Sequence, residues 1–268
     1  VGRVRATPAC RVGATMLSAA GGVDHAEGVF MGRPALAWTL ARLAGCARLD
    51  TIVIATTEPA RVRAILCGVE EKARARVEII EGVAGDIERA LAIASGRAWA
   101  DASWRAGLGG LTVFDEVFDP IATSAMLERT GADAALIVGP AWSLIDPALT
   151  DRIIERHLES PEGAALAFSQ APPGLAPAIV GRALVDDLAQ GQRNGLVFAS
   201  IGGALGYIPT QPRHDPIARP ACVQIDAELR GTLARFIPDD AHTRRQLERA
   251  LAGADCASIG ADGIAERW

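Results

Sequence analysis

The strongest constraint on the fold is a regular alternation of helical patterns with short, uninterrupted apolar runs. Leu36, Leu40 and Leu43 recur at helical spacing, and the run TIVIAT at 51–56 follows them after Gly45. A strand without polar alternation is typical of a parallel sheet that helices cover on both faces. The alternation therefore predicts an α/β fold.

The same alternation extends along most of the chain. It predicts strands over 51–56, 77–81, 111–114, 133–138, 164–168 and 235–238. It predicts helices over 34–45, 58–67, 86–94, 121–130, 147–158, 182–188 and 241–251. Strands and helices in this order indicate a three-layer sandwich with a mostly parallel central sheet and right-handed crossovers.

Length and composition indicate one domain. The 268 residues are 50% hydrophobic, which is enough for one large core, and no repeat or low-complexity linker interrupts them. We therefore expect a single domain over 1–268. Region 170–234 is rich in proline and glycine, and we expect it to form a lid, a substrate wall or a dimer contact. Because the chain begins at Val1 and ends at Trp268, we expect it to be a fragment of a larger protein.

Charge and cysteine spacing exclude several classes of protein. The net charge is -5 and no basic run is present, which argues against binding of nucleic acid or of a membrane surface. No segment approaches the roughly 18 apolar residues of a membrane-spanning helix, and residues 1–22 lack the apolar core of a signal peptide. We therefore expect a cytoplasmic protein. The five cysteines lie far apart, so they predict buried thiols rather than a zinc site or a disulfide framework.

A set of short motifs occurs in an order that resembles one enzyme family. The motifs are GRPAL at 32–36, LDTIVIATT at 49–57, VEIIEG at 77–82, GADAALIVG at 131–139, LIDP at 144–147 and RFIPD at 235–239. Together they resemble the sugar cytidylyltransferases, especially the spore-coat-polysaccharide type and the CMP-octulosonate synthetases. The resemblance implies the nucleotide-diphospho-sugar transferase (GT-A-like) fold, a nucleotide or sugar-nucleotide ligand, Mg²⁺ if the chain is active, and a homodimer.

Positions in or near these motifs are candidates for ligand contacts. Those that resemble nucleotide-binding positions are Gly21, Gly22, Glu81, Gly82, Asp86, Gly139 and Trp142. Those near the expected sugar are Gln170, Arg213 and His214. Each also has a structural interpretation: the glycines can simply turn the chain, Asp86 can cap a helix in the same way as Asp146, Trp142 can pack, and Arg213 can be solvated.

The chemistry of the family requires groups that this chain lacks at the matching positions. Transfer of a nucleotide needs a divalent cation on the phosphates and cationic donors for the developing charge. Segment 17–27 contains no lysine or arginine, and Pro140 stands where the family has a metal-binding Asp. The remaining candidates for a displaced Mg²⁺ site are Asp115, Asp119 and Asp239, of which the first two can instead cap the following helix.

Two hypotheses follow from these departures. One is a divergent cytidylyltransferase-like domain whose catalysis is lost or altered and which binds a nucleotide or sugar, scaffolds or dimerises. The alternative is an active Mg²⁺-dependent nucleotidyltransferase that makes a CMP-activated sugar with rearranged ligands. In some bacterial proteins such a domain precedes a radical-SAM enzyme, and we expect this chain to fit that arrangement. Glycosyl-transfer Asp-x-Asp, dinucleotide-binding and P-loop motifs do not occur in the sequence.

Overall fold

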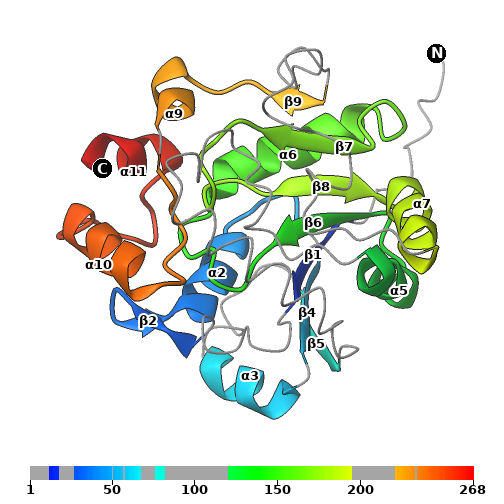
Figure 1. Cartoon of the computed structure of the whole chain (residues 1–268), viewed down its shortest axis with the longest axis horizontal. Coiled ribbons are helices and arrows are strands. Elements are labelled where there is room, and N and C mark those ends of the chain that lie inside the picture. Colours follow the sequence, from blue (N-terminus) through cyan, green and yellow to red (C-terminus); the bar gives the residue numbers. More distant parts are fainter. Residues whose placement is uncertain are drawn as a thin grey trace, which may run out of the picture.

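The computed structural model describes residues 12–17, 27–49, 51–56, 58–67, 76–81, 120–194, 221–232 and 234–268. In this part of the chain a seven-stranded sheet lies between helices (Figure 1). Its strands are β1 (Val12–Leu17), β4 (Thr51–Thr56), β5 (Arg76–Glu81), β6 (Ala134–Val138), β7 (Leu166–Ser169), β8 (Ala178–Gly181) and β9 (Cys222–Val223). The helices are α2 (Ala35–Leu43), α3 (Pro59–Leu66), α5 (Pro120–Thr130), α6 (Pro147–Glu159), α7 (Arg182–Arg193), α9 (Ala227–Gly231), α10 (Ala241–Ala250) and α11 (Ala261–Arg267).

The strand order is β5-β4-β1-β6-β8-β7-β9. Strands β5, β4, β1 and β6 run parallel, β8 is antiparallel to both β6 and β7, and β9 is parallel to β7. Four of the six pairings in this sheet are therefore parallel, which confirms the predicted mostly parallel sheet. The antiparallel strand β8 lies in region 170–234 and was not predicted.

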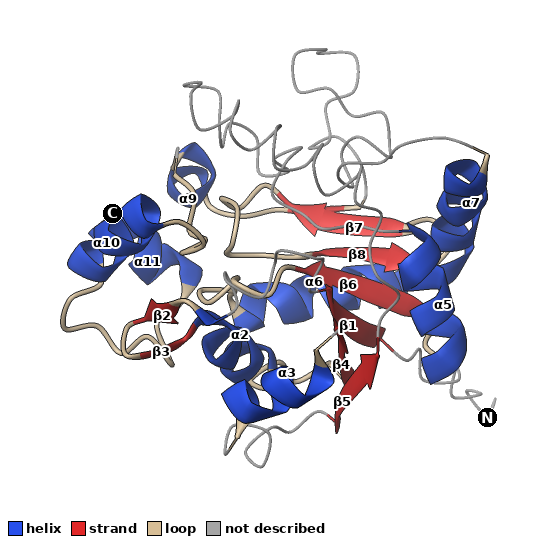
Figure 2. Cartoon of the chain, turned by 60° about the horizontal axis from the view of Figure 1, so that its bottom comes forward, coloured by secondary structure: helices blue, strands red, loops and turns tan. Residues whose placement is uncertain are grey.

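Apolar side chains of the central strands supply a core on each face of the sheet. Ile52, Ile54 and Leu136 pack in one cluster with residues of α2 and α6. Val53 and Ile137 pack in the other cluster with residues of α5 and α7, which lie side by side (Figure 2). Because successive side chains of a strand point to opposite faces, both apolar runs are buried throughout, as predicted, and the three layers follow.

Most predicted elements are confirmed within a few residues of the expected bounds. The predicted strand at 51–56 matches β4, and the predicted helices at 34–45 and 147–158 match α2 and α6. The predictions at 86–94 and 111–114 lie outside the described residues. The predicted N-cap is also present, because Asp146 accepts a hydrogen bond from the Leu149 amide at 2.8 Å.

The predicted strand at 235–238 is wrong. This segment belongs to no described strand, and its Phe236 amide donates to the Pro173 carbonyl at 2.8 Å. Proline at 238 and at 173 has no amide hydrogen, so a regular ladder of hydrogen bonds cannot form here. The apolar pattern instead reflects packing, since Phe236 is fully buried and Ile237 nearly so.

Several short elements were not predicted from the sequence pattern. They include helices α9 and α11 and the hairpin of β2 (Val29–Phe30) with β3 (Arg33–Pro34). The hairpin turn places Met31 at φ 47° and Gly32 at φ 78°. Two successive positive φ angles are typical of a type I′ hairpin turn, which explains the glycine.

Burial of the thiols agrees with the prediction for three of the four described cysteines. Cys46, Cys222 and Cys256 are buried, Cys67 is exposed, and none of these four forms a disulfide. Burial raises the pKa of the Cys46 thiol to about 12, so this thiol stays protonated and acts as a small apolar side chain.

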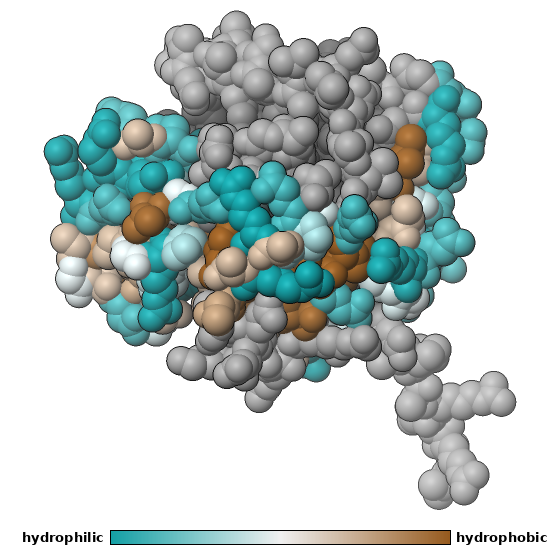
Figure 3. All heavy atoms as spheres, turned by 90° about the horizontal axis from the view of Figure 1, so that it is seen from below, coloured by the Kyte–Doolittle hydropathy of each residue, from teal (hydrophilic) through white to brown (hydrophobic). Residues whose placement is uncertain are grey.

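The described surface carries few large apolar side chains. Val29 and Trp268 are the exposed ones within the described ranges, and hydrophilic residues dominate the coloured face in Figure 3. Among the described helices, none has the length and apolar character that crossing a bilayer requires.

Candidate functional site

The strand order reverses between β1 and β6, and this reversal locates the candidate site. The chain leaves β1 for β4 on one side of it, whereas it leaves β6 for β7 on the other side. In open α/β sheets, ligands bind outside the carboxyl ends of the strands at such a reversal. Gly139 directly follows β6 at this point, so residues 139–146 form what we call the switch-point segment.

Hydrogen bonds fasten the switch-point segment to the start of α2. The Thr39 hydroxyl lies 3.0 Å from the Pro140 carbonyl, and the Ser143 hydroxyl donates to the Ala35 carbonyl at 3.1 Å. Both hydroxyl-bearing residues are fully buried. These hydrogen bonds therefore hold the switch-point segment in a fixed position against α2.

Packing of Trp142 accounts for the glycine at 139. A Cβ atom on Gly139 would lie 2.8 Å from the Trp142 indole, closer than a real contact. The indole belongs to the larger core cluster, and only 3% of Trp142 is exposed. The structure thus gives Trp142 a packing role, and its contact with a nucleotide stays a prediction, as does that of Gly139.

Behind the switch-point segment, Arg42 forms a buried hub. Its guanidinium donates to the carbonyls of Ile145 at 2.6 Å, Cys256 at 3.1 Å and Ile259 at 2.8 Å. Burial lowers the pKa of Arg42, and the nearby charge of Asp146 opposes that shift. The hub ties α2, the switch-point segment and the C-terminal residues together.

Asp146 connects the same parts of the chain a second time. One carboxylate oxygen caps α6, and the other accepts a hydrogen bond from the Ala261 amide at 2.6 Å, at the start of α11. A single buried carboxylate therefore stabilises two helix N-termini, where negative charge is favourable. Its interpretation as a cap is confirmed.

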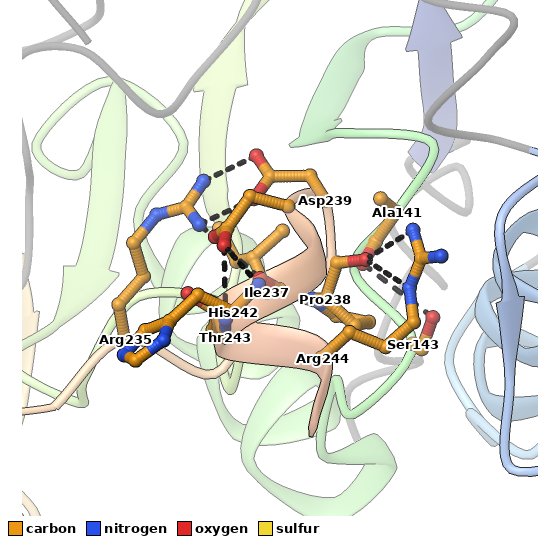
Figure 4. Close-up of polar contacts among 10 residues, drawn as sticks. Ala141, Ser143, Arg235, Ile237, Pro238, Asp239, His242, Thr243 and Arg244 are labelled. Carbon is orange, nitrogen blue, oxygen red and sulfur yellow. Dashed lines mark hydrogen bonds and ion pairs between the residues drawn. The ribbon is translucent and has the colours of Figure 1, made fainter. Parts of the chain in front are cut away.

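The predicted metal ligand Asp239 is already paired with an arginine. Both terminal nitrogens of Arg235 donate to its two carboxylate oxygens at 2.5 Å, in the bidentate arrangement shown in Figure 4. The neighbouring Asp240 caps α10 by accepting from the amides of His242 and Thr243. Both carboxylates therefore already have hydrogen-bond donors from the chain.

An ion-pair network lies at the end of segment 17–27. Arg61 of α3 donates to both oxygens of Glu27 and also to Glu58. The hydrogen bond from Arg61 lowers the pKa of Glu27, and the same hydrogen bond raises the pKa of Arg61. Both groups therefore stay charged across the physiological pH range.

The other predicted contact residues are only partly described. Glu81 ends β5 and is exposed, and Gln170 follows β7 and is half-buried, at the same carboxyl edge as Gly139. No described contact joins these three residues. The remaining candidates lie outside the described residues: Gly21, Gly22, Gly82, Asp86, Asp115, Asp119, Arg213 and His214.

The described residues do not fit a magnesium site. Within these ranges, no group of three or more histidine, cysteine, aspartate or glutamate side chains is placed to hold a metal ion. Pro140 has no donor side chain, and the carboxylate of Asp239 is bound by Arg235. A magnesium ion would need ligands from elsewhere in the chain.

Comparisons with known proteins identify the fold. No family model and no curated protein matches the sequence. A cytidylyltransferase from Leptospira borgpetersenii serovar Hardjo-bovis is 12% identical with a TM-score of 0.61, over 96% of this chain and 92% of that one. A Mycobacterium tuberculosis H37Rv protein is 13% identical with a TM-score of 0.52, over 90% of this chain and 98% of that one. A 4-diphosphocytidyl-2C-methyl-D-erythritol synthase is 12% identical with a TM-score of 0.50, over 91% of this chain and 99% of that one.

These similarities define the class of the fold. The chain has the nucleotide-diphospho-sugar transferase-like α/β fold of the cytidylyltransferases, as the motifs predicted. At 12% identity the likeness concerns the fold, and the chemistry has to be argued from the residues of the site.

Proposed function

We propose that this chain is a divergent cytidylyltransferase-like domain that binds a nucleotide or sugar nucleotide at the carboxyl ends of β1 and β6, with the catalysis of the fold lost or altered. The observation that carries the proposal is the switch-point segment. Its Pro140 carbonyl accepts a hydrogen bond from Thr39, and Trp142 packs onto Gly139. The position where the family has its metal carboxylate therefore serves packing here.

The late segment supports the same proposal. Asp239 matches the second metal-binding position of the family, and its side chain is only 9% exposed within the pair with Arg235. Metal binding would have to break two charge-assisted hydrogen bonds and leave the guanidinium without its anion. An intact pair favours a structural role for Asp239.

The alternative, an active nucleotidyltransferase, requires a metal site that the proposed binding function does not. It requires a cation on the phosphates and an acid to hold that cation. Asp115 and Asp119 are the acids that the sequence offers for that purpose. The two functions are separated by whether binding of a nucleotide depends on Mg²⁺ and is followed by release of pyrophosphate.

Ligand-induced stabilisation tests the proposed binding. A ligand at 100 times its Kd stabilises the native state by about 2.7 kcal/mol, and each kcal/mol shifts Tm by about 2 to 4 °C in a domain approaching this size. We expect CMP, CTP or a CMP-sugar to raise Tm by several degrees without Mg²⁺, and ribose alone to have no effect. A flat response to all three nucleotides would contradict the proposal.

A further inference from the structure

Three partly exposed arginines differ in their partners. Arg61 is paired with Glu27 and Glu58, and Arg235 is paired with Asp239. Arg244, on α10, has a different environment: its Nε and Nη2 both donate to one carbonyl, that of Pro238, at 3.3 and 3.2 Å. Within the described part of the chain, no carboxylate pairs with Arg244. Its charge is therefore only weakly compensated.

Arg244 lies where three segments of the site meet. Its Nη2 would be 2.3 Å from a Cβ atom on Gly28, so the guanidinium rests directly on the backbone of that glycine. The Gly28 carbonyl accepts from the Ala35 amide at 2.9 Å, and Ala35 in turn accepts from Ser143 of the switch-point segment. Figure 4 shows the guanidinium directed at the Pro238 carbonyl, on the side of Ala141 and Ser143.

We propose that Arg244 is the anion-binding residue of this site and that it binds a phosphate group of the ligand. This inference rests on the proposed function. A guanidinium presents donors in a planar fork that matches phosphate oxygens, and Arg244 uses two of its nitrogens for contact with a single carbonyl, at 3.3 and 3.2 Å. Its Nη1 group has no described partner, so it is available to a phosphate oxygen.

Arg244 also supplies a basic group, which the sequence lacks in segment 17–27. Segment 17–27 contains no arginine or lysine, although phosphate binding by the family uses basic residues there. Arg244 reaches the end of that segment at Gly28 from a helix more than 200 residues further along the chain. A basic group from the C-terminal helix thus replaces the missing basic loop.

The Arg244 guanidinium packs against Gly28 because this residue has no side chain. A methyl group at position 28 would occupy the space of Nη2 and displace the side chain without removing its charge. Gly28 is not among the described glycines with positive φ, so Gly28→Ala introduces no backbone strain. Gly28→Ala therefore tests whether binding depends on where the Arg244 guanidinium lies, because the variant keeps its charge.

Calorimetric titration of inorganic phosphate and of CMP, without Mg²⁺, tests the inference. The proteins are the wild type, Arg244→Gln, Arg244→Lys, Gly28→Ala and the matched control Arg245→Gln, whose arginine is exposed on the same helix. Loss of one charge-assisted contact corresponds to about tenfold in Kd. We expect about that loss in Arg244→Gln, a smaller loss in Gly28→Ala, partial rescue in Arg244→Lys, and less than about twofold change in Arg245→Gln.

Each outcome separates this inference from the proposed function. Binding of CMP that is equal in wild type and Arg244→Gln overturns the role of Arg244 and leaves the nucleotide-binding function standing. Arg244-dependent binding of phosphate without any binding of CMP supports the anion site and overturns the nucleotide-binding function. Absence of both in the wild type overturns both. Equal Tm of the wild type and Arg244→Gln, measured without ligand, shows that lost binding is not lost folding.

Discussion

Two polar regions of the molecule use the same residue types differently. In the first, Arg42 and Asp146 are 2% and 7% exposed, and their side chains are held by carbonyls and amides from distant parts of the chain. In the second, Arg61 is far more exposed and Arg244 has a single carbonyl as its described partner. We call the first region the buried hub and the second, together with Asp240, the rim. Complete hydrogen bonding in the interior specifies one structure, whereas incomplete hydrogen bonding at the rim leaves donors for a ligand.

Removal of Arg42 should have the largest effect on stability. Arg42→Ala leaves two buried carbonyls and one partly buried carbonyl without this donor, and we expect a loss of about 3 to 5 kcal/mol in the free energy of unfolding. Urea denaturation measures this loss. The matched control is Arg48→Ala, whose exposed pair with Glu155 contributes about 1 kcal/mol or less. Equal losses in both variants would show that the hub does not hold the fold together.

Asp146 should follow, because it caps two helices. In Asp146→Ala the amides of Leu149 and Ala261 lose their acceptor, at a cost of about 2 to 4 kcal/mol. Since Arg42 and Asp146 also interact through their charges, the double variant should lose less than the sum of the single losses. Additive losses in a denaturation cycle would contradict one coupled hub.

Asp240 at the rim should contribute less, and its contribution should depend on pH. Burial alone would raise the pKa of Asp240, but hydrogen bonds from Thr243 and His242 and the charge of Arg235 together lower it below its ordinary value of 3.8. The stabilisation is then complete above that ordinary value and is lost as pH falls through the lowered folded value. Because asparagine can still cap the helix but carries no charge, we expect Asp240→Asn to cost about 0.3 to 1 kcal/mol at neutral pH.

Urea midpoints across a pH series measure this contribution. The difference between the wild type and Asp240→Asn should stay constant at mildly acidic and neutral pH. It should shrink when the pH is taken well below 3.8, the ordinary carboxyl value. A difference that grows on acidification would contradict the sign of the shift.

Arg61 should have the smallest effect on stability. Its side chain is 40% exposed, so solvent screens its pairs with Glu27 and Glu58. We expect Arg61→Gln to leave the urea midpoint close to that of the wild type. A loss as large as that of Arg42→Ala would erase the distinction between the hub and the rim.

The sequence predicted the parts of the fold that local pattern controls. Apolar runs identified β4 and β6, and the Asp-Pro pair identified the start of α6, because burial of both strand faces and capping leave local signals. The strand β8 was missed because four apolar residues after a proline-rich stretch carry no periodicity. The pattern at 235–238 was misread because packing and strand formation require the same apolar residues.

Only those residues of the candidate site that lie in a sequence motif could be predicted. Gly139 and Asp146 belong to motifs, but the reason for the glycine is the indole three residues later, which spacing does not reveal. Arg42 looks like any surface arginine of a helix, and its partners lie far along the chain, two of them more than 200 residues away. Arg244 was missed for the same reason, since only the folded chain brings it to Gly28.

The most direct test of the central claim is calorimetric titration of CTP into the wild type and into Asp239→Ala, each with and without Mg²⁺. If catalysis through the family's metal site is lost, CTP binds without Mg²⁺, addition of Mg²⁺ changes Kd by less than about twofold (a difference of about 0.4 kcal/mol), and no pyrophosphate is released. Mg²⁺-dependent binding of CTP that disappears in Asp239→Ala, together with release of pyrophosphate by the wild type, would contradict the account.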